Sequence, residues 1–332
     1  MDFDREKGPG IDNPGYDGGM TSFHMPSPTF IPVSVSYKNL NVRSKGSKQW
    51  FPFINSTQEP LHIIKDLTGH VAAGHILAIL GASGSGKTTF LNTLTGRNLR
   101  SVRVEGNLFL NGELASTDDV KSLSSYVQQD DLFIGMLTVK EHLIFQATLR
   151  STSDQTEEMV NQKVEHLLSE LGLSQVADTR INCESSGQHI SGGEMKRLSI
   201  ATEILTDPVI LLLDEPTSGL DSFMAVSVVS VLKSMAHQGR TIFCTIHQPS
   251  SEIFAMFNEV LLLSEGRAAF MGKASDALDF FSSIGFRCPS NHNPSDFYIR
   301  QLAIVPGEEV ECKSKVQVRF KTKIGLFPNF LF

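Results

Sequence analysis

The sequence predicts an α/β protein whose core is a largely parallel β-sheet with helices on its faces. Short, fully apolar runs at Ile76–Leu80, 209–213 and 260–263 are typical of strands that are buried on both sides. A further strand is predicted at 241–246, and helical patterns separate these segments. Because buried strands that alternate with helices are joined by crossovers, the pattern indicates parallel pairing.

Local patterns predict the remaining elements. Val33, Val35 and Tyr37 alternate with polar residues as in a half-buried strand, and residues 41–59 read as a polar loop. A strand pair is expected to turn at Asn111 and Gly112.

Helices are predicted in the middle of the chain. A capping box from Thr138 to Glu141 begins a helix that runs to about Arg150. Apolar residues between Val160 and Leu171 share one face of a second helix, which ends at Gly172.

Composition excludes several classes of protein. The chain has 332 residues and a formal net charge of −7, which argues against nucleic acid as the main partner. No run reaches the ~18 to 20 apolar residues of a membrane-spanning helix, and no secretory signal is visible. Residues 1–30 are rich in Gly, Pro, Asp and Ser, so a disordered tail is expected there.

A phosphate-binding pattern, GxxxxGK[ST], follows the apolar run Ile76–Leu80. Its glycines let main-chain N–H groups face phosphate oxygens, and the helix predicted from Lys87 adds its positive end. Lys87 is expected to reach the β- and γ-phosphates, and Thr88 to hold Mg²⁺. The alternative is a glycine-rich turn with an incidental lysine. The predicted nucleotide-binding residues are Gly81, Ala82, Ser83, Gly84, Ser85, Gly86, Lys87, Thr88 and Thr89.

Two carboxylates, Asp214 and Glu215, end the apolar strand at 209–213. Ligands of open α/β sheets bind at the carboxyl ends of strands, where the phosphate loop is also expected. Asp214 is therefore predicted to support Mg²⁺, and Glu215 to polarise an attacking water. Together the motifs indicate hydrolysis of a nucleoside triphosphate.

The segment Ile190-Ser-Gly-Gly-Glu194 begins another predicted helix. Ser191 and Glu194 have the spacing of a capping box, so the spacing alone does not separate a well-capped helix from a ligand site.

The order of these motifs, followed by Ser218-Gly-Leu-Asp221 and His247, resembles an ATP-binding cassette domain over roughly residues 33–303. The amino-acid sequences of segments 190–199, 245–250 and 293–298 are similar to those of the G subfamily of half-transporters. Segment 302–309 resembles the White, eye-pigment type within that subfamily. The resemblance implies a P-loop NTPase fold with a RecA-like mixed sheet core, an antiparallel β subdomain and a helical signature subdomain at about 132–205. The predicted division is a tail at 1–30, a cassette at 31–303 and a linker or tail at 304–332.

Residue roles follow from the same resemblance. Gln129 matches the Q-loop residue that contacts Mg²⁺ and the catalytic water, Glu215 the catalytic base, and His247 the switch histidine. Asp221 matches the D-loop aspartate. Val42, with Tyr37 nearby, falls where many cassettes stack an aromatic side chain on adenine. The implied metal contacts are Thr88, Gln129 and Asp214.

The resemblance also implies a partner. Two cassettes, identical or different, would pair head to tail, so that Ser191, Gly192 and Gly193 of one chain cover ATP held by Lys87 of the other. Family members lie on the cytosolic face of a membrane and continue into a membrane domain. We expect that domain to be absent here, the likeness to fade from about Lys315, and the chain alone to be cytoplasmic.

Two other functions stay open at this point. One is a truncated cassette that binds ATP and partner cassettes without transport, as an interaction or interfering protein. The other is a soluble cassette ATPase of the translation or repair kind, but such proteins usually carry two cassettes. The sequence around His247 and Asn293 also disfavours the second reading.

Overall fold

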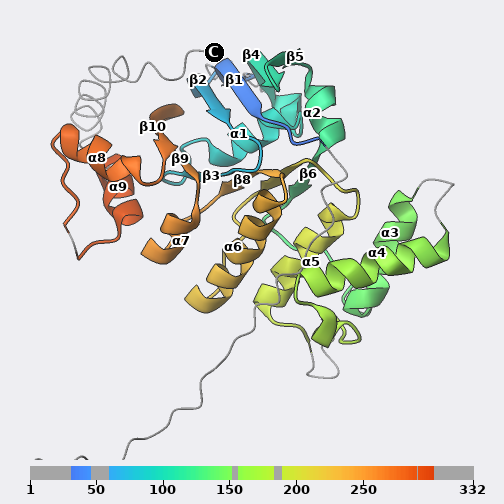
Figure 1. The fold of residues 1–332 in the computed structure, drawn as a ribbon. Coiled ribbons are helices and arrows are strands. Elements are labelled where there is room, and N and C mark those ends of the chain that lie inside the picture. The colour runs from blue at the N-terminus through green and yellow to red at the C-terminus, as the bar shows by residue number, and fades with distance from the viewer. Residues whose placement is uncertain (1–30, 46–59, 152–155, 183–188, 290, 303–332) are drawn as a thin grey trace, which may run out of the picture.

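The computed structural model describes residues 31–45, 60–151, 156–182, 189–289 and 291–302. Two β-sheets form its centre, and helices surround the larger one (Figure 1). The predicted tails at 1–30 and 304–332 lie outside the described residues.

The larger sheet has six strands in the order β10-β9-β3-β8-β7-β6. All neighbouring pairs are parallel except β9 and β10, which form a hairpin. The predicted parallel core is therefore confirmed. Its strands are β3 (Ile76–Leu80), β6 (Ser124–Val127), β7 (Ile210–Leu213), β8 (Thr241–Thr245), β9 (Glu259–Ser264) and β10 (Arg267–Lys273).

This sheet is buried on both faces. Along β3, Ile76, Ala78 and Leu80 join one apolar cluster, whereas Leu77 and Ile79 join another on the opposite face. Successive side chains of a strand point to opposite faces, so a continuous apolar run requires cover on both. Helices cover the first face, and α1 together with the smaller sheet covers the second.

The smaller sheet is antiparallel, in the order β2-β1-β4-β5. The predicted turn at Asn111 and Gly112 connects its last two strands. Its strands are β1 (Val35–Ser44), β2 (His62–Val71), β4 (Val102–Leu110) and β5 (Glu113–Ala115).

The predicted polar loop at 41–59 begins too early, because β1 continues to Ser44. Val42 pairs with Ile64 on one side and with Val104 on the other, and its side chain is fully buried. Asn41 donates a hydrogen bond to Asp66 on β2. The polar residues therefore belong to a strand whose inner face is apolar, and residues 46–59 lie outside the description.

The helices follow the sequence pattern closely. The predicted capping boxes begin α3 and α5, and α3 ends at Arg150 as expected. Helix α3 packs against both α4 and α5 within the predicted 132–205 region (Figure 1). The helices are α1 (Lys87–Leu94), α2 (Thr117–Leu123), α3 (Val139–Arg150), α4 (Glu157–Glu170), α5 (Gly192–Ile204), α6 (Ser222–His237), α7 (Ser251–Met256), α8 (Asp276–Ser283) and α9 (Pro294–Leu302), with 3-10 turns at Leu99–Ser101 and Ser174–Val176.

Candidate functional site

The phosphate loop connects β3 to α1. Gly84 and Gly86 have φ angles of 77° and 103°, a left-handed region that glycine enters without steric cost. Gly86 is the N-cap of α1, and because glycine has no side chain, no side chain caps the first N–H groups of this helix. Such free donors at the positive end of a helix form an anion-binding site.

Lys87 lies folded against this loop. Its Nζ donates hydrogen bonds to the carbonyl oxygens of Gly81 (2.8 Å) and Ala82 (3.2 Å), and only 7% of the residue is exposed. Burial lowers the pKa of Lys87, although the nearby Glu215 and Asp214 act in the opposite direction. A cation that is desolvated and held by neutral carbonyls has a stronger partner available in phosphate oxygen.

A second feature of the loop fits a phosphate. The hydroxyl of Ser85 is buried and has no hydrogen-bond partner among the described residues. Buried hydroxyls are normally hydrogen-bonded, and an orphaned one next to main-chain donors matches an oxygen-rich ligand.

Asp214 is buried and receives three hydroxyl groups. Its Oδ1 accepts from Thr245 (2.6 Å) and Thr88 (3.2 Å), and its Oδ2 accepts from Tyr126 (3.2 Å). The predicted metal contacts Thr88 and Asp214 are thus brought together. Their hard oxygen donors fit Mg²⁺, which takes few protein ligands and completes its shell with water and phosphate. Among the described residues no group of three or more acidic, histidine or cysteine side chains forms a cation cage.

The predicted catalytic residues follow neighbouring strands. Sheet order places β3, β8, β7 and β6 side by side, and all four run parallel. The phosphate loop follows β3, His247 follows β8, Glu215 follows β7 and Gln129 follows β6. Their carboxyl ends meet at one edge of the sheet, so these residues share that edge.

Glu215 has an unusual main-chain conformation. Its φ angle is 48°, and its N–H donates a 2.8 Å hydrogen bond to the Thr245 hydroxyl. A non-glycine residue in this region carries a strain of roughly 1 to 2 kcal/mol, which the surrounding contacts must offset. Gln248, which follows the exposed His247, has the same conformation at φ 48°.

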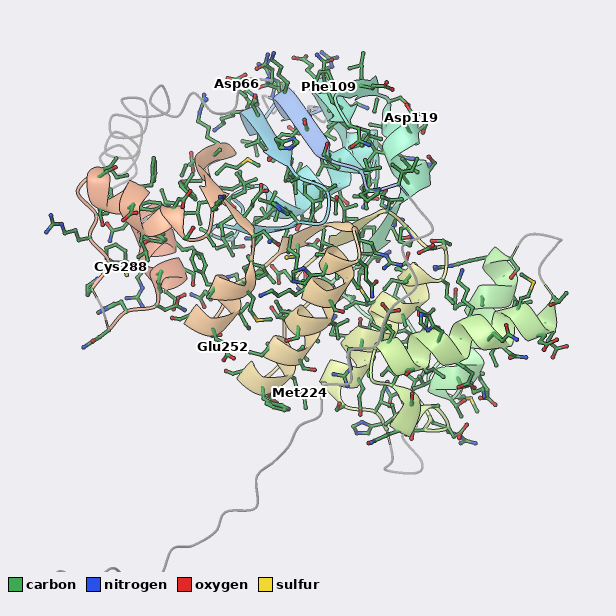
Figure 2. All side chains as sticks on the ribbon, viewed as in Figure 1. Asp66, Phe109, Asp119, Met224, Glu252 and Cys288 are labelled. Atoms are coloured by element: carbon green, nitrogen blue, oxygen red, sulfur yellow. The ribbon has the colours of Figure 1, made fainter. Side chains whose placement is uncertain are left out.

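Ser191, Gly192 and Gly193, called the signature residues from here on, lie at the start of α5, the signature helix. Ser191 Oγ and its main-chain N–H both donate to Glu194 Oε2, at 2.8 Å and 2.7 Å. Asp221 caps α6 by accepting from the N–H of Met224 at 2.9 Å. Met224, at the start of α6 (Figure 2), lies against Gly193, where an added Cβ would be 3.3 Å from it. Within the described parts of the chain, no hydrogen bond connects these residues to the phosphate loop.

Neither residue considered for adenine stacking can present a ring or side chain to a base. Val42 and Tyr37 are both fully buried in the core of the antiparallel sheet. The Tyr37 hydroxyl donates to Met271 Sδ at 3.3 Å, and its ring packs edge-on against Phe90. The residue that stacks on adenine, which the sequence left open, therefore stays unassigned.

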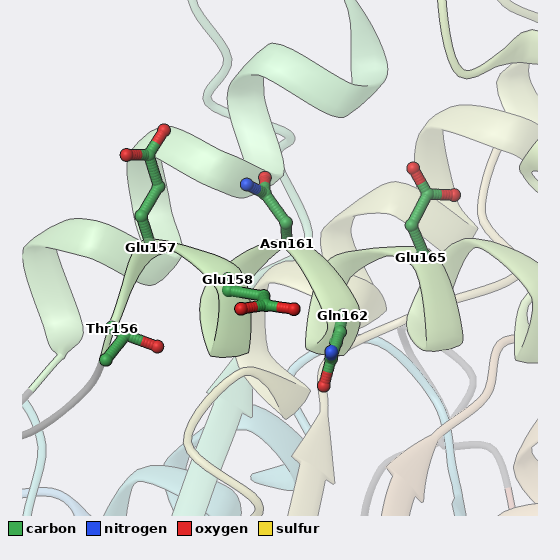
Figure 3. Close-up of a pocket in the computed structure, with 6 residues that line it drawn as sticks. All are labelled: Thr156, Glu157, Glu158, Asn161, Gln162 and Glu165. Carbon is green, nitrogen blue, oxygen red and sulfur yellow. The ribbon is translucent and has the colours of Figure 1, made fainter.

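A surface hollow occurs away from this edge. It lies along one side of α4 and is lined by Thr156, Glu157, Glu158, Asn161, Gln162 and Glu165 (Figure 3). Its three carboxylates would repel a phosphate group, so the hollow does not compete with the phosphate loop as a nucleotide site.

Sequence reasoning missed three residues of the site. Tyr126 and Thr245 hold Asp214, and Lys196 donates a 2.6 Å hydrogen bond to the carbonyl oxygen of Gln129. The first two sit in strand patterns that explain them as core, and Lys196 looks like a surface lysine of α5. The available signal at Thr245 was a polar residue at the end of a fully buried strand, two residues before His247.

Known proteins resemble the chain over this same region. A family model described as ABC transporter matches residues 64–218, and one described as ABC-2 type transporter matches residues 247–322. The second match, which is to a membrane-domain model, extends past Lys315, so the likeness does not fade there and the expected absence of that domain is corrected to a partial presence. Among the described helices, none is long and apolar enough to cross a bilayer.

Curated relatives agree with these matches. The chain is 48% identical to Protein white of Drosophila melanogaster, over 77% of this chain and 37% of that protein. It is 44% identical to the ABC transporter ATP-binding protein/permease wht-1 of Caenorhabditis elegans, over 79% and 40%. It is 38% identical to ATP-binding cassette sub-family G member 5 of Mus musculus, over 91% and 47%. The chain thus spans less than half the length of each.

Solved structures share the fold. The cbiO1 subunit of the cbiONQ ABC transporter complex from Clostridium perfringens aligns with a TM-score of 0.60 at 22% identity, covering 76% of this chain and 94% of that one. A dimeric structure of the ATP-binding cassette MJ0796 in a post-hydrolysis state with ADP and Pi aligns with a TM-score of 0.57 at 22% identity, covering 72% and 98%.

Proposed function

The chain belongs to the ATP-binding cassette transporter family, and within it to the White-like half-transporters of the G subfamily; on that premise we propose that it is the ATP-binding and ATP-hydrolysing cassette that powers transport of small molecules across a membrane. The observation that carries the proposal is the shared edge of β3, β8, β7 and β6. The phosphate loop, His247, Glu215 and Gln129 all follow strands that end there.

Binding begins at the phosphate loop. Main-chain N–H groups of residues 81–89 and the start of α1 face the β- and γ-phosphates, and Lys87 exchanges two carbonyl partners for phosphate oxygens. The Thr88 hydroxyl and the Asp214 carboxylate would hold Mg²⁺, which supplies charge neutralisation to the phosphates when bound. Gln129 is the third proposed contact of the metal.

Hydrolysis requires a base and a sensor of the γ-phosphate. Glu215 is only partly exposed and its main chain is fixed by Thr245, so its carboxylate can orient a water for in-line attack. His247 is exposed at the end of the neighbouring strand, where a ring nitrogen can donate to the γ-phosphate.

A second chain completes the site. Ser191, Gly192 and Gly193 begin α5 away from their own phosphate loop, and a glycine-rich helix start is an anion site for a ligand supplied from outside. Head-to-tail pairing with an identical or related cassette would place it over the partner's ATP, with Asp221 at the same interface. The dimeric cassette structure that shares the fold supports pairing.

The relatives' longer chains support a membrane-attached setting on the cytosolic face for the whole protein. The alternative of a non-transporting interaction protein is not favoured by these comparisons. White-type relatives suggest pigment precursors as cargo by analogy alone.

ATP turnover tests the proposal. The purified chain, alone or with a partner cassette, is expected to hydrolyse ATP, and Glu215→Gln is expected to abolish turnover while leaving ATP binding intact. ATP binding without turnover, both in the chain alone and with a partner cassette, would instead support the alternative of a non-transporting interaction protein.

A further inference from the structure

Lys196 occupies an unusual place on the signature helix. Only 6% of the residue is exposed, although it lies four residues after the exposed Gly192, the first residue of the helix. Its Nζ donates to the carbonyl oxygen of Gln129 at 2.6 Å and forms an ion pair with Asp131 Oδ2 at 2.9 Å. One buried ammonium thus binds the Gln129 segment at two points.

Burial makes this charged contact costly to break. A lysine ammonium has three donors, and a buried one is tolerated only when acceptors surround it. Asp131 depends on it in turn: the other carboxylate oxygen, Oδ1, is buried without a hydrogen-bond partner in the described part of the chain. Removing either charge would leave the other one buried and unpaired, so the two segments hold each other in place.

The neighbouring basic residue does something different. Arg197 donates from Nη1 to Ser227 on α6, at 3.3 Å, and so ties α5 to the next helix rather than to the Gln129 segment. The link between the signature helix and Gln129 therefore runs through Lys196.

We propose that Lys196 is a positioning residue that couples the two ATP sites of a cassette pair. The inference rests on the proposed function, in which Gln129 serves the ATP of its own chain and Ser191 to Gly193 serve the partner's. When a phosphate held by the partner chain binds at the start of α5 and displaces the helix, Lys196 transmits that displacement to the Gln129 carbonyl and to Asp131. Occupancy of one site then changes how well Gln129 is placed in the other.

Four variants of the full chain test this role. Lys196→Met removes the charge while keeping a long apolar stem, Lys196→Arg restores the charge, and Asp131→Asn removes the partner charge. Lys140→Met is the matched control, because Lys140 forms an exposed ion pair with Glu165 between α3 and α4, in the same part of the fold.

Turnover against ATP concentration gives the first readout. Lys196→Met and Asp131→Asn are expected to lower kcat about tenfold, with KM for ATP changed less than about threefold, and to reduce the Hill coefficient to about one. Lys196→Arg recovers most of the kcat, and Lys140→Met behaves as the unaltered chain. A Lys196→Met chain with unaltered kcat and Hill coefficient, or one that loses only thermal stability, overturns the proposal.

Hydrogen exchange gives a second readout that needs no turnover. Mg-ATP is expected to slow exchange at both 128–131 and 192–195 in the unaltered chain, and Lys196→Met is expected to uncouple the two segments. If Mg-ATP slows exchange of both segments in the variant as much as in the unaltered chain, the proposal is contradicted. Absence of turnover in the unaltered chain counts against the proposed function instead, and the exchange result still decides the role of Lys196.

Discussion

Thr245 and Asp214 form the shortest hydrogen bond to the carboxylate at the centre of the site, with 2.6 Å between Thr245 Oγ1 and Asp214 Oδ1. The same hydroxyl accepts from the N–H of Glu215 at 2.8 Å. Thr245 is fully buried at the end of β8, the strand that precedes His247. One side chain thus fixes the carboxylate that is proposed to bind the metal and the main chain of the proposed base.

Thr245→Val is expected to lower both stability and activity. The isosteric change removes a donor from Asp214 and an acceptor from Glu215, and a buried group left unpaired costs roughly 1 to 3 kcal/mol. Urea unfolding measures the free-energy loss, and turnover at saturating ATP measures the loss of kcat. Thr245→Ser keeps the hydroxyl and is the control; equal losses in both variants would argue that the methyl group matters and the hydrogen bonds do not.

Lys87→Ala is expected to weaken ATP binding by about 10- to 100-fold, since a charge-assisted hydrogen bond contributes roughly 1.5 to 3 kcal/mol. Calorimetric titration of ATP into the folded chain gives the affinity. Arg100→Ala is a suitable control, because it removes an exposed basic side chain in the last turn of a short 3-10 helix. Unchanged affinity in Lys87→Ala would refute the placement of the phosphate site.

Gly266→Ala is expected to be more destabilising than Gly112→Ala. Both glycines have positive φ angles, 76° and 83°, so both substitutions carry a similar strain of about 1 kcal/mol. At Gly266, however, the new Cβ would lie 1.9 Å from the Ile63 carbonyl oxygen, whereas nothing lies within 4 Å at Gly112.

The Gly266 effect should also reach the phosphate loop, because the Gly266 N–H donates to the Ser85 carbonyl at 3.2 Å. Thermal unfolding and ATP affinity of the two variants measure both consequences. A Gly266→Ala chain that is as stable as Gly112→Ala would show that the backbone there yields at little cost.

His142 is expected to make the fold sensitive to acid. Burial first, and then the charge of Arg150, lower the pKa of His142 from 6.5 to about 4. The unfolded chain therefore binds a proton between pH 6.5 and 4 that the folded chain does not, and stability falls as pH falls through that range.

Between pH 7 and pH 5, His142 is expected to lower the free energy of unfolding by about 2 kcal/mol. Urea unfolding at both pH values, compared with His142→Gln, isolates it. The pH-dependent loss should shrink by about that amount in the variant. If both chains lose equal stability, His142 is protonated in the fold.

Motifs with a local cause could be predicted from the sequence. The phosphate loop, the capping box at Ser191 and the carboxylate pair at 214 and 215 each depend on residues next to one another in the chain. The parallel sheet followed from apolar runs such as Ile76–Leu80, since only strands covered on both faces carry them.

Features with a tertiary cause could not be predicted. The polar residues Asn41 and Arg43 hid the continuation of β1, because the strands that pair with it are distant in sequence. Arg43, for example, pairs with His62 and with Arg103, about twenty and sixty residues away. Thr245 and Lys196 acquire their roles only when β7 and the Gln129 segment are folded against them. Pairing with a second chain was implied by family resemblance, and stays a proposal.

Sedimentation of the Glu215→Gln chain tests most directly the central proposal, that two chains together form each ATP site. A chain that binds ATP but cannot hydrolyse it should accumulate in the closed pair, so we expect a monomer without ATP and a dimer with ATP and Mg²⁺. Adding Lys87→Ala to the same chain should abolish the shift. A Glu215→Gln chain that binds ATP and stays monomeric at every protein concentration would contradict the account.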